Sequence, residues 1–497
     1  MRDIPLISML LGVDVGTTHT KAGIYDCEGR LVVHERIPTN RVNKSKALAY
    51  RSPDILWQDS AALIKRVVQN LEEPVAGLAV SSMGEAGVPL DSKGEATFPI
   101  IPWNDTRAVS QMERLIERLP PDRWSAVTGL FPSPIFSIAK WMWIRETEPE
   151  AWDKTSLWLS VCNYLSYRLT GEAVMESSQA CRTMAFDIRA RTWAEDLLSF
   201  AELESTFLPP VVSATHKVGE VTSKASSETG LVVGTPVFAG GHDHFCAALA
   251  CGVVTPEVAF DSLGTSEALT LGWKAPPDPA TANGFSVGIH VIENHSYLLG
   301  GLYSSGGTIQ WLKQLLGLSS FEELRHLAQS VEPTQAPLFV AHFLGSGPPF
   351  NDPASSGAFV NLEPDHGPEH LARAVVDGLA FEISAGIEKM EQVTGLPITV
   401  TRLVGAADDD DLSPRVRASV LDRPVEVARY SDMVTMGNAL IAGIGLGVYK
   451  DALDAVDKTY QVRCVFEPEE NLHVQYRDMY ERQRTLVSAL RESRKGA

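Results

Sequence analysis

The feature of this sequence that most constrains the fold is a strand–turn–strand unit that occurs twice, half a chain length apart. In the first unit, the apolar run 9–15 leads into a Gly-Thr-Thr turn at 16–18, and another strand-like run follows from residue 22. In the second unit, the strand-like run 257–261 leads into a Gly-Thr-Ser turn at 264–266. The turn glycines, Gly16 and Gly264, are 248 positions apart in a chain of 497 residues. A repeat of this period predicts two related α/β halves, each with its own hairpin.

Both hairpin turns have the chemistry of a phosphate site. Backbone N–H groups and hydroxyls on such a turn can surround phosphate oxygens, and Lys21 adds a positive charge close to the first turn. Asp14, just before that turn, is a carboxylate suited to holding a magnesium ion through water. A single turn of this kind is more often a plain hairpin turn. Two turns in equivalent places favour a nucleotide whose phosphates lie between them.

Near the midpoint of the chain, Asp243 follows a Gly-Gly turn between a strand-like run at 235–239 and a helix-like run at 246–252. α/β proteins place their chemistry at such junctions, which makes Asp243 a candidate catalytic residue. The alternative is that Asp243 only caps the helix that follows. The flanking His242 and His244 are candidates for a contact with a substrate hydroxyl or for packing around the carboxylate.

Composition argues against several classes of function. The chain has 43 basic and 62 acidic residues, a formal charge of −19, and no basic stripe, which argues against nucleic-acid binding. Its six cysteines form no Cys-x-x-Cys pair, as is typical of reduced thiols in a cytosolic enzyme. The longest apolar run, 433–448, contains Asn438 and repeated glycines and is expected to form a buried helix. Without a signal-peptide pattern or a membrane-length apolar run, we expect a cytoplasmic protein without a membrane partner.

Three segments together resemble a known family. The stretches 14–21, 240–243 and 261–266 read Asp-Val-Gly-Thr-Thr-His-Thr-Lys, Gly-Gly-His-Asp and Asp-Ser-Leu-Gly-Thr-Ser. They are similar to the two phosphate motifs and the catalytic aspartate of the FGGY carbohydrate kinases, which belong to the superfamily of sugar kinases, actin and heat-shock chaperones. The similarity extends over about residues 10 to 455, because further segments resemble the family in the same order: 101–107, 128–140, 167–171, 305–311, 352–359 and 371–381.

The resemblance implies an α/β fold of two ribonuclease-H-like domains, as in actin-like ATPases, with duplicated topology and a cleft between them. The first domain is expected at 9–250, on the sugar and phosphate side, with a helical insertion near 110–215. The second domain is expected at 254–455, on the nucleotide side. Residues 456–497 form a C-terminal extension, for which we expect an amphipathic helix that returns to the first domain.

The family also implies an ATP-dependent kinase that transfers the γ-phosphate of ATP to a hydroxyl of a small sugar, ketose or polyol, with ATP and Mg²⁺ as cofactors. By this resemblance Asp243 is the general base, and Asp14 holds magnesium through water. The residues implied on the nucleotide side are Gly16, Thr17, Thr18, Lys21, Gly264, Thr265, Gly306, Gln310, Gly405 and Ala406. Those implied on the sugar side are Glu85, Trp103, Asn104, Asp105, Arg107 and His244. Relatives are often dimers, so a homodimer is compatible with the resemblance.

The charges on the sugar side predict a neutral substrate. The carboxylates of Glu85 and Asp105 would repel a substrate that carries its own carboxylate or phosphate. They would accept strong hydrogen bonds from neutral hydroxyls. Arg107 is expected to pair with Asp105, two residues away, rather than to bind an acidic substrate.

The sequence departs from the family at two places. The family's adenosine loop usually reads Gly-Gly-Gly-Ala, whereas here Gly405 and Ala406 are followed by four aspartates at 408–411. These aspartates are expected to form a solvated acidic loop, the alternative being a contact with the ribose or with a lysine. At 81–86 the histidine of xylulose kinases is missing, while Glu85 falls where glycerol kinases carry a substrate-binding glutamate. The sequence therefore does not identify the sugar.

Two other functions are also compatible with the sequence. An actin- or chaperone-like ATPase would use the same nucleotide fold to drive partner binding, and sugars would then not stimulate ADP formation. A non-catalytic paralogue that senses sugars is the second alternative, supported only by the altered adenosine loop. The intact Asp243 and the two glycine–threonine turns favour the kinase.

Overall fold

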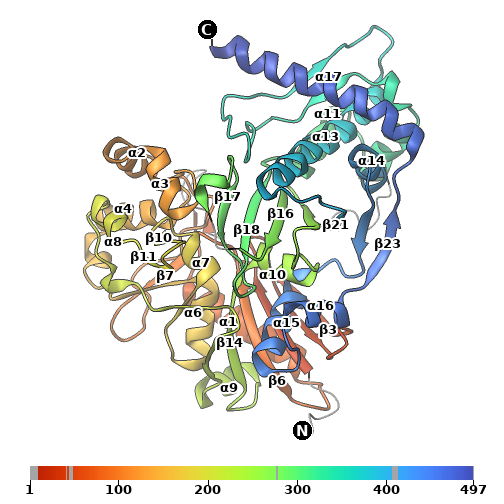
Figure 1. Cartoon of the computed structure of the whole chain (residues 1–497). Coiled ribbons are helices and arrows are strands. Elements are labelled where there is room, and N and C mark those ends of the chain that lie inside the picture. Colours follow the sequence, from red (N-terminus) through yellow and green to blue (C-terminus); the bar gives the residue numbers. More distant parts are fainter. Residues whose placement is uncertain (1–8, 41, 44–48, 276–277, 406–411, 496–497) are drawn as a thin grey trace.

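Two mixed β-sheets form the framework of the protein in the computed structural model, which describes residues 9–40, 42–43, 49–275, 278–405 and 412–495. The first sheet has six strands, in the order β13 (Lys217–Glu220), β14 (Pro236–His242), β6 (Val75–Ser82), β1 (Met9–Val15), β2 (His19–Tyr25) and β3 (Leu31–Pro38). The second sheet has seven, in the order β17 (Ser286–Ile289), β18 (Ser296–Leu302), β16 (Glu267–Trp273), β15 (Val258–Leu263), β21 (Val400–Gly405), β22 (Val425–Ala428) and β23 (Val462–Phe466). Figure 1 shows the first sheet in the lower part of the molecule and the second above it.

The two sheets share one topology. The order β3-β2-β1-β6-β14 in the first sheet corresponds to β18-β16-β15-β21-β22 in the second. In each, a three-stranded antiparallel meander is followed by two strands parallel to its first strand. The repeated turns in the sequence thus mark a repeat of whole α/β halves. The expected pair of related ribonuclease-H-like domains is confirmed.

Parallel pairing in the first sheet brings three chain segments to one edge. Asp14 in β1 is paired with Ser81 in β6, and His242 in β14 is paired with Ser82. Because β1, β6 and β14 run in the same direction, the segments that follow them begin side by side. These segments are the first glycine–threonine turn, the loop that carries Glu85, and α10 (Asp243–Ala250).

A helix from the second half of the chain covers the first sheet. α15 (Met433–Leu446) lies against β1, and its Asn438 donates hydrogen bonds to Val13 O (3.0 Å) and to Ser81 Oγ (2.7 Å). A Cβ added at Gly12 would lie only 1.8 Å from the carbonyl oxygen of Thr435, so the two backbones touch there. In Figure 1 the blue helices α15 and α16 (Ala452–Thr459) accordingly lie beside strands of the first sheet. Part of the segment 254–455 thus packs on the first half.

The C-terminal helix α17 (Glu470–Lys495) packs on the second half of the molecule (Figure 1). The hydroxyl of Tyr476 donates to Asp377 of α13 (Pro368–Thr394) at 2.9 Å, and Gln483 donates to Glu382 of the same helix at 2.9 Å. The expectation that this helix returns to the first domain is therefore wrong. An amphipathic pattern shows that a helix has a buried face, but it does not show which surface covers that face.

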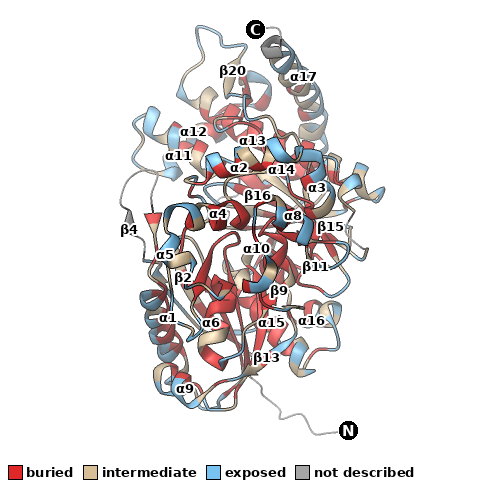
Figure 2. Cartoon of the chain, turned by 90° about the vertical axis from the view of Figure 1, so that its left-hand side faces the viewer, coloured by how far each residue is buried: buried red, intermediate tan, exposed pale blue. Residues whose placement is uncertain are grey.

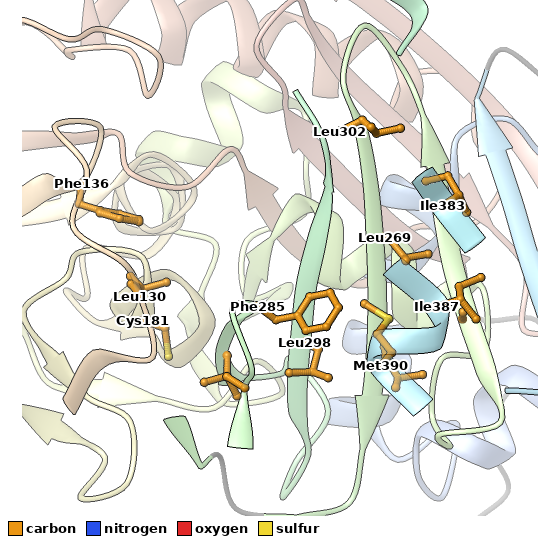
Figure 3. Close-up of a cluster of buried hydrophobic side chains, with 14 of the residues drawn as sticks. Leu130, Phe136, Cys181, Leu269, Phe285, Leu298, Leu302, Ile383, Ile387 and Met390 are labelled. Carbon is orange, nitrogen blue, oxygen red and sulfur yellow. The ribbon is translucent and has the colours of Figure 1, made fainter. Parts of the chain in front are cut away.

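The insertion that follows β6 packs against the second sheet. In β17, the N–H of Val287 donates to the carbonyl of Gly129 in the insertion at 3.0 Å. Figure 3 shows part of the buried cluster that joins the two, which includes Leu130, Phe136, Cys181, Phe285 and Leu298. Figure 2 shows that the sheets and the helices between them are buried, whereas helices at the periphery, such as α1 (Pro53–Val68), expose one face.

Shorter elements complete the described chain. The other helices are α2 (Val109–Arg118), α3 (Pro121–Thr128), α4 (Ser137–Thr147), α5 (Pro149–Trp152), α6 (Val161–Thr170), α7 (Ser177–Cys181), α8 (Glu195–Phe200), α9 (Ser223–Thr229), α11 (Gly306–Leu315), α12 (Phe321–Gln329) and α14 (Leu412–Leu421). Pairs of short strands are β4 (Val42–Asn43) with β5 (Ala49–Tyr50), β7 (Gly87–Leu90) with β8 (Leu157–Ser160), β9 (Met175–Glu176) with β12 (Val211–Val212), β10 (Phe186–Asp187) with β11 (Thr192–Trp193), and β19 (Leu338–Val340) with β20 (Ala358–Val360). In the described part of the chain, no helix combines the length and the apolar character that crossing a membrane requires.

The close contact between α15 and α10 gives a test of this arrangement. A Cβ added at Gly437 of α15 would lie 1.9 Å from the carbonyl oxygen of Cys246 in α10. Gly437→Ala should therefore lower the free energy of unfolding by about 1–3 kcal/mol, the range for overpacking. In an exposed helix the same change would instead stabilise the protein, because alanine is favoured over glycine by about 1 kcal/mol. Thermal unfolding measures the change.

Gly386→Ala in α13 is the matched control, because its Cβ would meet only the end of the Leu269 side chain, at 2.9 Å. Equal stability of the two variants would contradict the close packing of α10 and α15.

Candidate active site

Asp14 lies at the carboxyl end of β1 and is almost fully buried. Its Oδ1 accepts a hydrogen bond from Ser81 Oγ at 2.9 Å, and Ser81 itself accepts one from Asn438 of α15. Its Oδ2 lies 3.8 Å from Lys21 Nζ. Burial raises the pKa of Asp14 to about 7; Lys21 counteracts the rise, and the negative charge of Asp243 adds to it. A cation bound at this edge would therefore stabilise the ionised form of Asp14.

Asp243 is the first residue of α10, and its side chain is 19% exposed. Its Oδ1 accepts the backbone N–H of His244 at 2.7 Å and lies 2.9 Å from Nδ1 of His242. Burial favours the protonated form, but these two histidines hold the pKa of Asp243 far below its usual range. His242, not Asp243, is the N-cap of α10. Within the described residues Oδ2 has no hydrogen-bond partner, so an ionised oxygen is left to accept a proton.

Lys21 lies between two carboxylates. Its Nζ is 3.8 Å from Asp14 Oδ2 and 3.5 Å from Oδ1 of Asp432, the N-cap of α15. The other oxygen of Asp432 lies 2.7 Å from Nε2 of His34. Burial disfavours the charged ammonium, but Asp14 and Asp432 together raise the pKa of Lys21. The lysine is therefore charged at the edge of the first sheet.

The first glycine–threonine turn is held by residues outside the hairpin. Thr17 Oγ1 accepts the indole N–H of Trp103 at 2.9 Å, and Thr17 O accepts a hydrogen bond from Arg51 Nη2 at 2.6 Å. Thr18 is exposed, and its carbonyl accepts the N–H of Thr39 at 2.8 Å. Trp103, expected on the sugar side, thus contacts the turn expected to hold phosphate.

The second turn is joined to the start of α11. The N–H groups of Gly306 and Gly307 donate to the carbonyls of Gly264 and Thr265, both at 3.0 Å. A Cβ added at Gly306 would lie 2.5 Å from Gly264 O, so a larger residue would disturb the turn. Gln310 lies on the next turn of α11. The first N–H groups of α11 are therefore used to hold the second turn, whose Thr265 is exposed.

Gly405 ends β21 beside the second turn, where it is paired with Leu263 of β15. Its φ of +106° and the position of a Cβ, which would lie 2.0 Å from Leu263 O, both require glycine. Strand pairing thus brings Gly405 next to Gly264 and Thr265. The expectations for Ala406 and for the aspartates at 408–411 concern residues outside the described part of the chain.

Glu85 lies on the loop after β6, with a φ of +59° that few residues other than glycine adopt. Its Oε1 accepts a hydrogen bond from Arg182 Nε at 2.6 Å and lies 2.5 Å from Nη2 of the same arginine. Both side chains are nearly buried, with exposed fractions of 6% and 9%. A Cβ added at Gly84 would lie 2.8 Å from the His242 ring and 3.2 Å from Arg182 Cγ. The ion pair therefore lies next to the turn that carries Asp243.

Lys140 of α4 (Ser137–Thr147) binds the two loops that carry Glu85 and Trp103. Its buried Nζ donates to the carbonyls of Glu85 (3.0 Å), Pro102 (2.9 Å) and Trp103 (3.3 Å). Burial lowers the pKa of Lys140 to about 7, although the charge of Glu85 opposes this. Three carbonyl oxygens in this geometry fix the Glu85 loop relative to the Trp103 loop.

Asp105 and Arg107 bind each other. Arg107 donates from Nε to Oδ1 at 2.8 Å and from Nη2 to Oδ2 at 2.6 Å, and Nη2 also donates to Ala49 O at 2.7 Å. The side chains of Asp105 and Arg107 are only 1% and 2% exposed, and the guanidinium lies over the Tyr50 ring. Asn104, next to them, is exposed. The pairing expected for Arg107 is present, and a direct role of this pair in sugar binding stays a prediction.

His244 is half-buried beside the carboxylate of Asp243. Its ring stacks on that of His242, with centroids 5.5 Å apart and an interplanar angle of 27°. Burial lowers the pKa of His244, although the charge of Asp243 opposes the shift. The imidazole is therefore neutral at neutral pH and has one donor and one acceptor nitrogen, as a contact with a hydroxyl requires.

Comparison with known proteins gives the same family for both halves. Residues 9–250 match the N-terminal domain of the FGGY family of carbohydrate kinases, and residues 259–446 match its C-terminal domain. The chain belongs to the FGGY family of carbohydrate kinases. It is an ATP-dependent sugar kinase, as expected from the resemblance, and this disfavours an ATPase that drives partner binding.

Relatives match this kinase along most of its length. A xylulose kinase of Staphylococcus epidermidis is 28% identical over 97% of this chain and 96% of its own length. A glycerol kinase of Thermococcus gammatolerans is 26% identical over 92% of this chain and 93% of its own. The crystal structure of gluconate kinase from Lactobacillus acidophilus has a TM-score of 0.90 at 21% identity and covers 97% and 98% of the two chains. At that identity the structural match shows the fold alone.

Three residues at the site of the kinase were not predicted as functional from the sequence: Lys140, Arg182 and Asp432. Lys140 ends one of the segments that resemble the family, but nothing local identifies the carbonyls it binds. Asp432 directly precedes the apolar run 433–448, which is a signal for an N-cap but not for a partner of Lys21. Arg182 follows the short helix α7 and has no local signal at all.

The buried pair of Asp105 and Arg107 gives a prediction about the kinase. Arg107→Met should destabilise its first half by about 3 kcal/mol or more, because Asp105 would remain as a buried charge without its partner. Thermal unfolding should show a lower midpoint, whereas the KM for the sugar should change little in the folded enzyme.

Arg114→Met is the control, since it removes a partly exposed ion pair with Glu146 and should cost about 0–1 kcal/mol. A raised KM with unchanged stability would show instead that Arg107 binds the sugar.

Proposed function

We propose that this kinase transfers the γ-phosphate of ATP to a hydroxyl of a small neutral sugar, ketose or polyol, with Asp243 as the general base. The observation that carries the proposal is the ionised carboxylate of Asp243 at the junction of β14 and α10, partly exposed and with Oδ2 unpaired among the described residues. Its neighbours at the sheet edge are Asp14 and the Glu85–Arg182 pair. A base, a carboxylate for a metal and a hydrogen-bonding pair therefore adjoin one another.

The described residues fit ATP and magnesium. Each glycine–threonine turn exposes one threonine, Thr18 in the first and Thr265 in the second. Asp14 is the carboxylate that would hold a hydrated magnesium ion, and Lys21 lies beside it as a second cation. When bound, magnesium neutralises charge on the phosphates as the phosphoryl group leaves.

Asp243 takes up the proton of the attacking hydroxyl through Oδ2. Because the transition state of phosphoryl transfer is largely dissociative, the hydroxyl needs orientation more than early deprotonation. A carboxylate with a lowered pKa suits this role, since it stays ionised and accepts a hydrogen bond from the hydroxyl throughout the approach. His242 and the N–H of His244 fix the direction of that carboxylate.

The charges around Asp243 favour a neutral acceptor. Arg182 is paired with Glu85, and Arg107 is paired with Asp105, so an acidic sugar would have to break a buried ion pair to gain a cation. A neutral hydroxyl needs no such break, because it can donate to Glu85 directly. The relatives named xylulose kinase and glycerol kinase act on a ketose and a polyol, which agrees with this class. A coupled assay of ADP release over ketoses, polyols and aldonic acids tests the proposal.

Asp243→Asn tests the base. Asparagine keeps the shape of the side chain but cannot take up a proton, so kcat should fall ~10²–10⁴-fold. ATP affinity, measured by calorimetry, should stay close to that of the wild type. Asp451→Asn is the control, because it changes an exposed N-cap of α16 to an equally good one. If Asp243→Asn turns over at the wild-type rate, the role of Asp243 is structural and not catalytic.

Glu85→Gln tests the acceptor site. A hydrogen bond to a charged group contributes about 1.5–3 kcal/mol. The loss of the charged acceptor should therefore raise the KM for the best neutral sugar by roughly tenfold or more. The KM for ATP should stay nearly constant. Glu172→Gln, an exposed change on the same half, is the control.

The wild-type panel decides the charge of the acceptor independently of this variant. If a sugar acid has the highest kcat/KM, the neutral-substrate proposal is overturned, and Arg182 or Arg107 becomes the candidate to bind its carboxylate.

A further inference from the structure

The short helix α7 lies between the turn that carries Asp243 and the loop that carries Glu85, and none of its residues is among the proposed catalytic or binding residues. Its N-cap is Glu176, which is fully buried. One carboxylate oxygen of Glu176, Oε2, accepts the N–H of Ser178 at 2.8 Å, the N–H of Gln179 at 3.1 Å and the hydroxyl of Ser178 at 2.5 Å. The start of the helix and the rotamer of Ser178 are therefore set by this buried carboxylate.

Ser178 and Gln179 hold the two ends of a single peptide group. Ser178 Oγ accepts the N–H of His242 at 3.0 Å. Gln179 Nε2 lies 3.3 Å from the carbonyl oxygen of Gly241 and donates to it. These groups belong to the peptide between Gly241 and His242, one residue before Asp243. Two consecutive side chains thus fix the orientation of the backbone from which the proposed base projects.

The bond from Ser178 to His242 depends on Glu176. A serine hydroxyl has one proton, and here that proton is donated to the carboxylate, so the oxygen lone pairs are left for the N–H of His242. Gly241 lets the helix approach this closely, because a Cβ there would lie 3.1 Å from Ser178 Oγ and 2.6 Å from Val291.

The same helix reaches the acceptor side of the site. Gln179 Nε2 also donates to the carbonyl of Ser82 at 3.1 Å, at the end of β6 where the Glu85 loop begins. Arg182, the residue after α7, forms the ion pair with Glu85. One turn of helix is therefore bonded to the backbone before Asp243, to the backbone before the Glu85 loop, and to the carboxylate of Glu85.

We propose that Ser178 and Gln179 are positioning residues for phosphoryl transfer, which set the distance and angle between Asp243 and the acceptor hydroxyl held at Glu85. This inference rests on the proposed function. Neither side chain needs to touch the sugar, since both act through the peptide before Asp243. Gln179 binds the backbone before both loops, at Ser82 and at Gly241, whereas Ser178 binds only the backbone before Asp243.

The test separates positioning from general stabilisation. We would make Ser178→Ala and Gln179→Met in the full chain, and count active sites by calorimetric titration with the best acceptor from the panel. A displacement of about 1 Å at the reacting groups lowers the rate by roughly 10²-fold, so kcat per sugar-binding site should fall by about 10–100-fold in each variant. Affinities for the sugar and for ATP should change far less than kcat.

Ser60→Ala is the matched control, since it removes a fully buried serine hydroxyl of α1 that has no hydrogen-bond partner among the described residues. Its kcat per site should equal that of the wild type. Ser178→Thr keeps the Oγ and should recover much of the rate lost in Ser178→Ala. Because both residues hold one peptide, the double variant should lose less than the product of the two single losses.

The outcomes are distinct. Lower yields or lower unfolding midpoints with an unchanged kcat per site would show that α7 only stabilises the fold, and would overturn the inference. A parallel loss of kcat and sugar affinity in both variants would place them in the sugar pocket and would also overturn it. A wild-type enzyme that phosphorylates no member of the panel would instead overturn the proposed function.

Discussion

Parallel hydrogen bonding between β1, β6 and β14 is the constraint on which the site depends. The register of these strands places Asp14 beside Ser81, and His242 beside Ser82. A shift by one residue would turn every side chain of a strand to the opposite face of the sheet. The carboxylate of Asp14, the Glu85 loop and the Asp243 turn are therefore brought together by backbone pairing. Side-chain contacts then adjust their orientation.

The distribution of buried charge shows why chemistry is expected in one half only. In the second sheet, β15 corresponds to β1 and also carries an aspartate, Asp261. There Arg417 lies 3.2 Å from Asp261 and 2.7 Å from Glu267, with all three side chains at most 1% exposed. Neither carboxylate of this closed cluster is accessible. In the first half, by contrast, Asp243 is partly exposed, and Lys21 is shared between Asp14 and Asp432.

Local patterns in the sequence were enough for the framework and for the position of Asp243 between a strand and a helix. Apolar strand-like runs and glycine–threonine turns mark β1, β2, β15 and β16, and their repeat predicts the duplicated sheets. The partners of charged side chains were not predictable in this way. Arg182 meets Glu85 across 97 positions, and Asp432 meets Lys21 across more than 400, so their pairing exists only once the sheets are assembled. The surface that covers α17 was missed for the same reason, since an amphipathic stripe does not specify its partner.

The packing of α15, from the second half of the chain, on the first sheet has a consequence for how the chain folds. All the strands of the first sheet have been synthesised by residue 242, but the helix that covers β1 spans Met433–Leu446. Until that helix emerges from the ribosome, an apolar surface that includes Leu10, Ala79 and Phe238 stays open to water. Exposed surface of this kind promotes aggregation of folding intermediates. The first half therefore cannot complete its core during synthesis, and a fragment that stops after α10 would lack a structural part of its own domain.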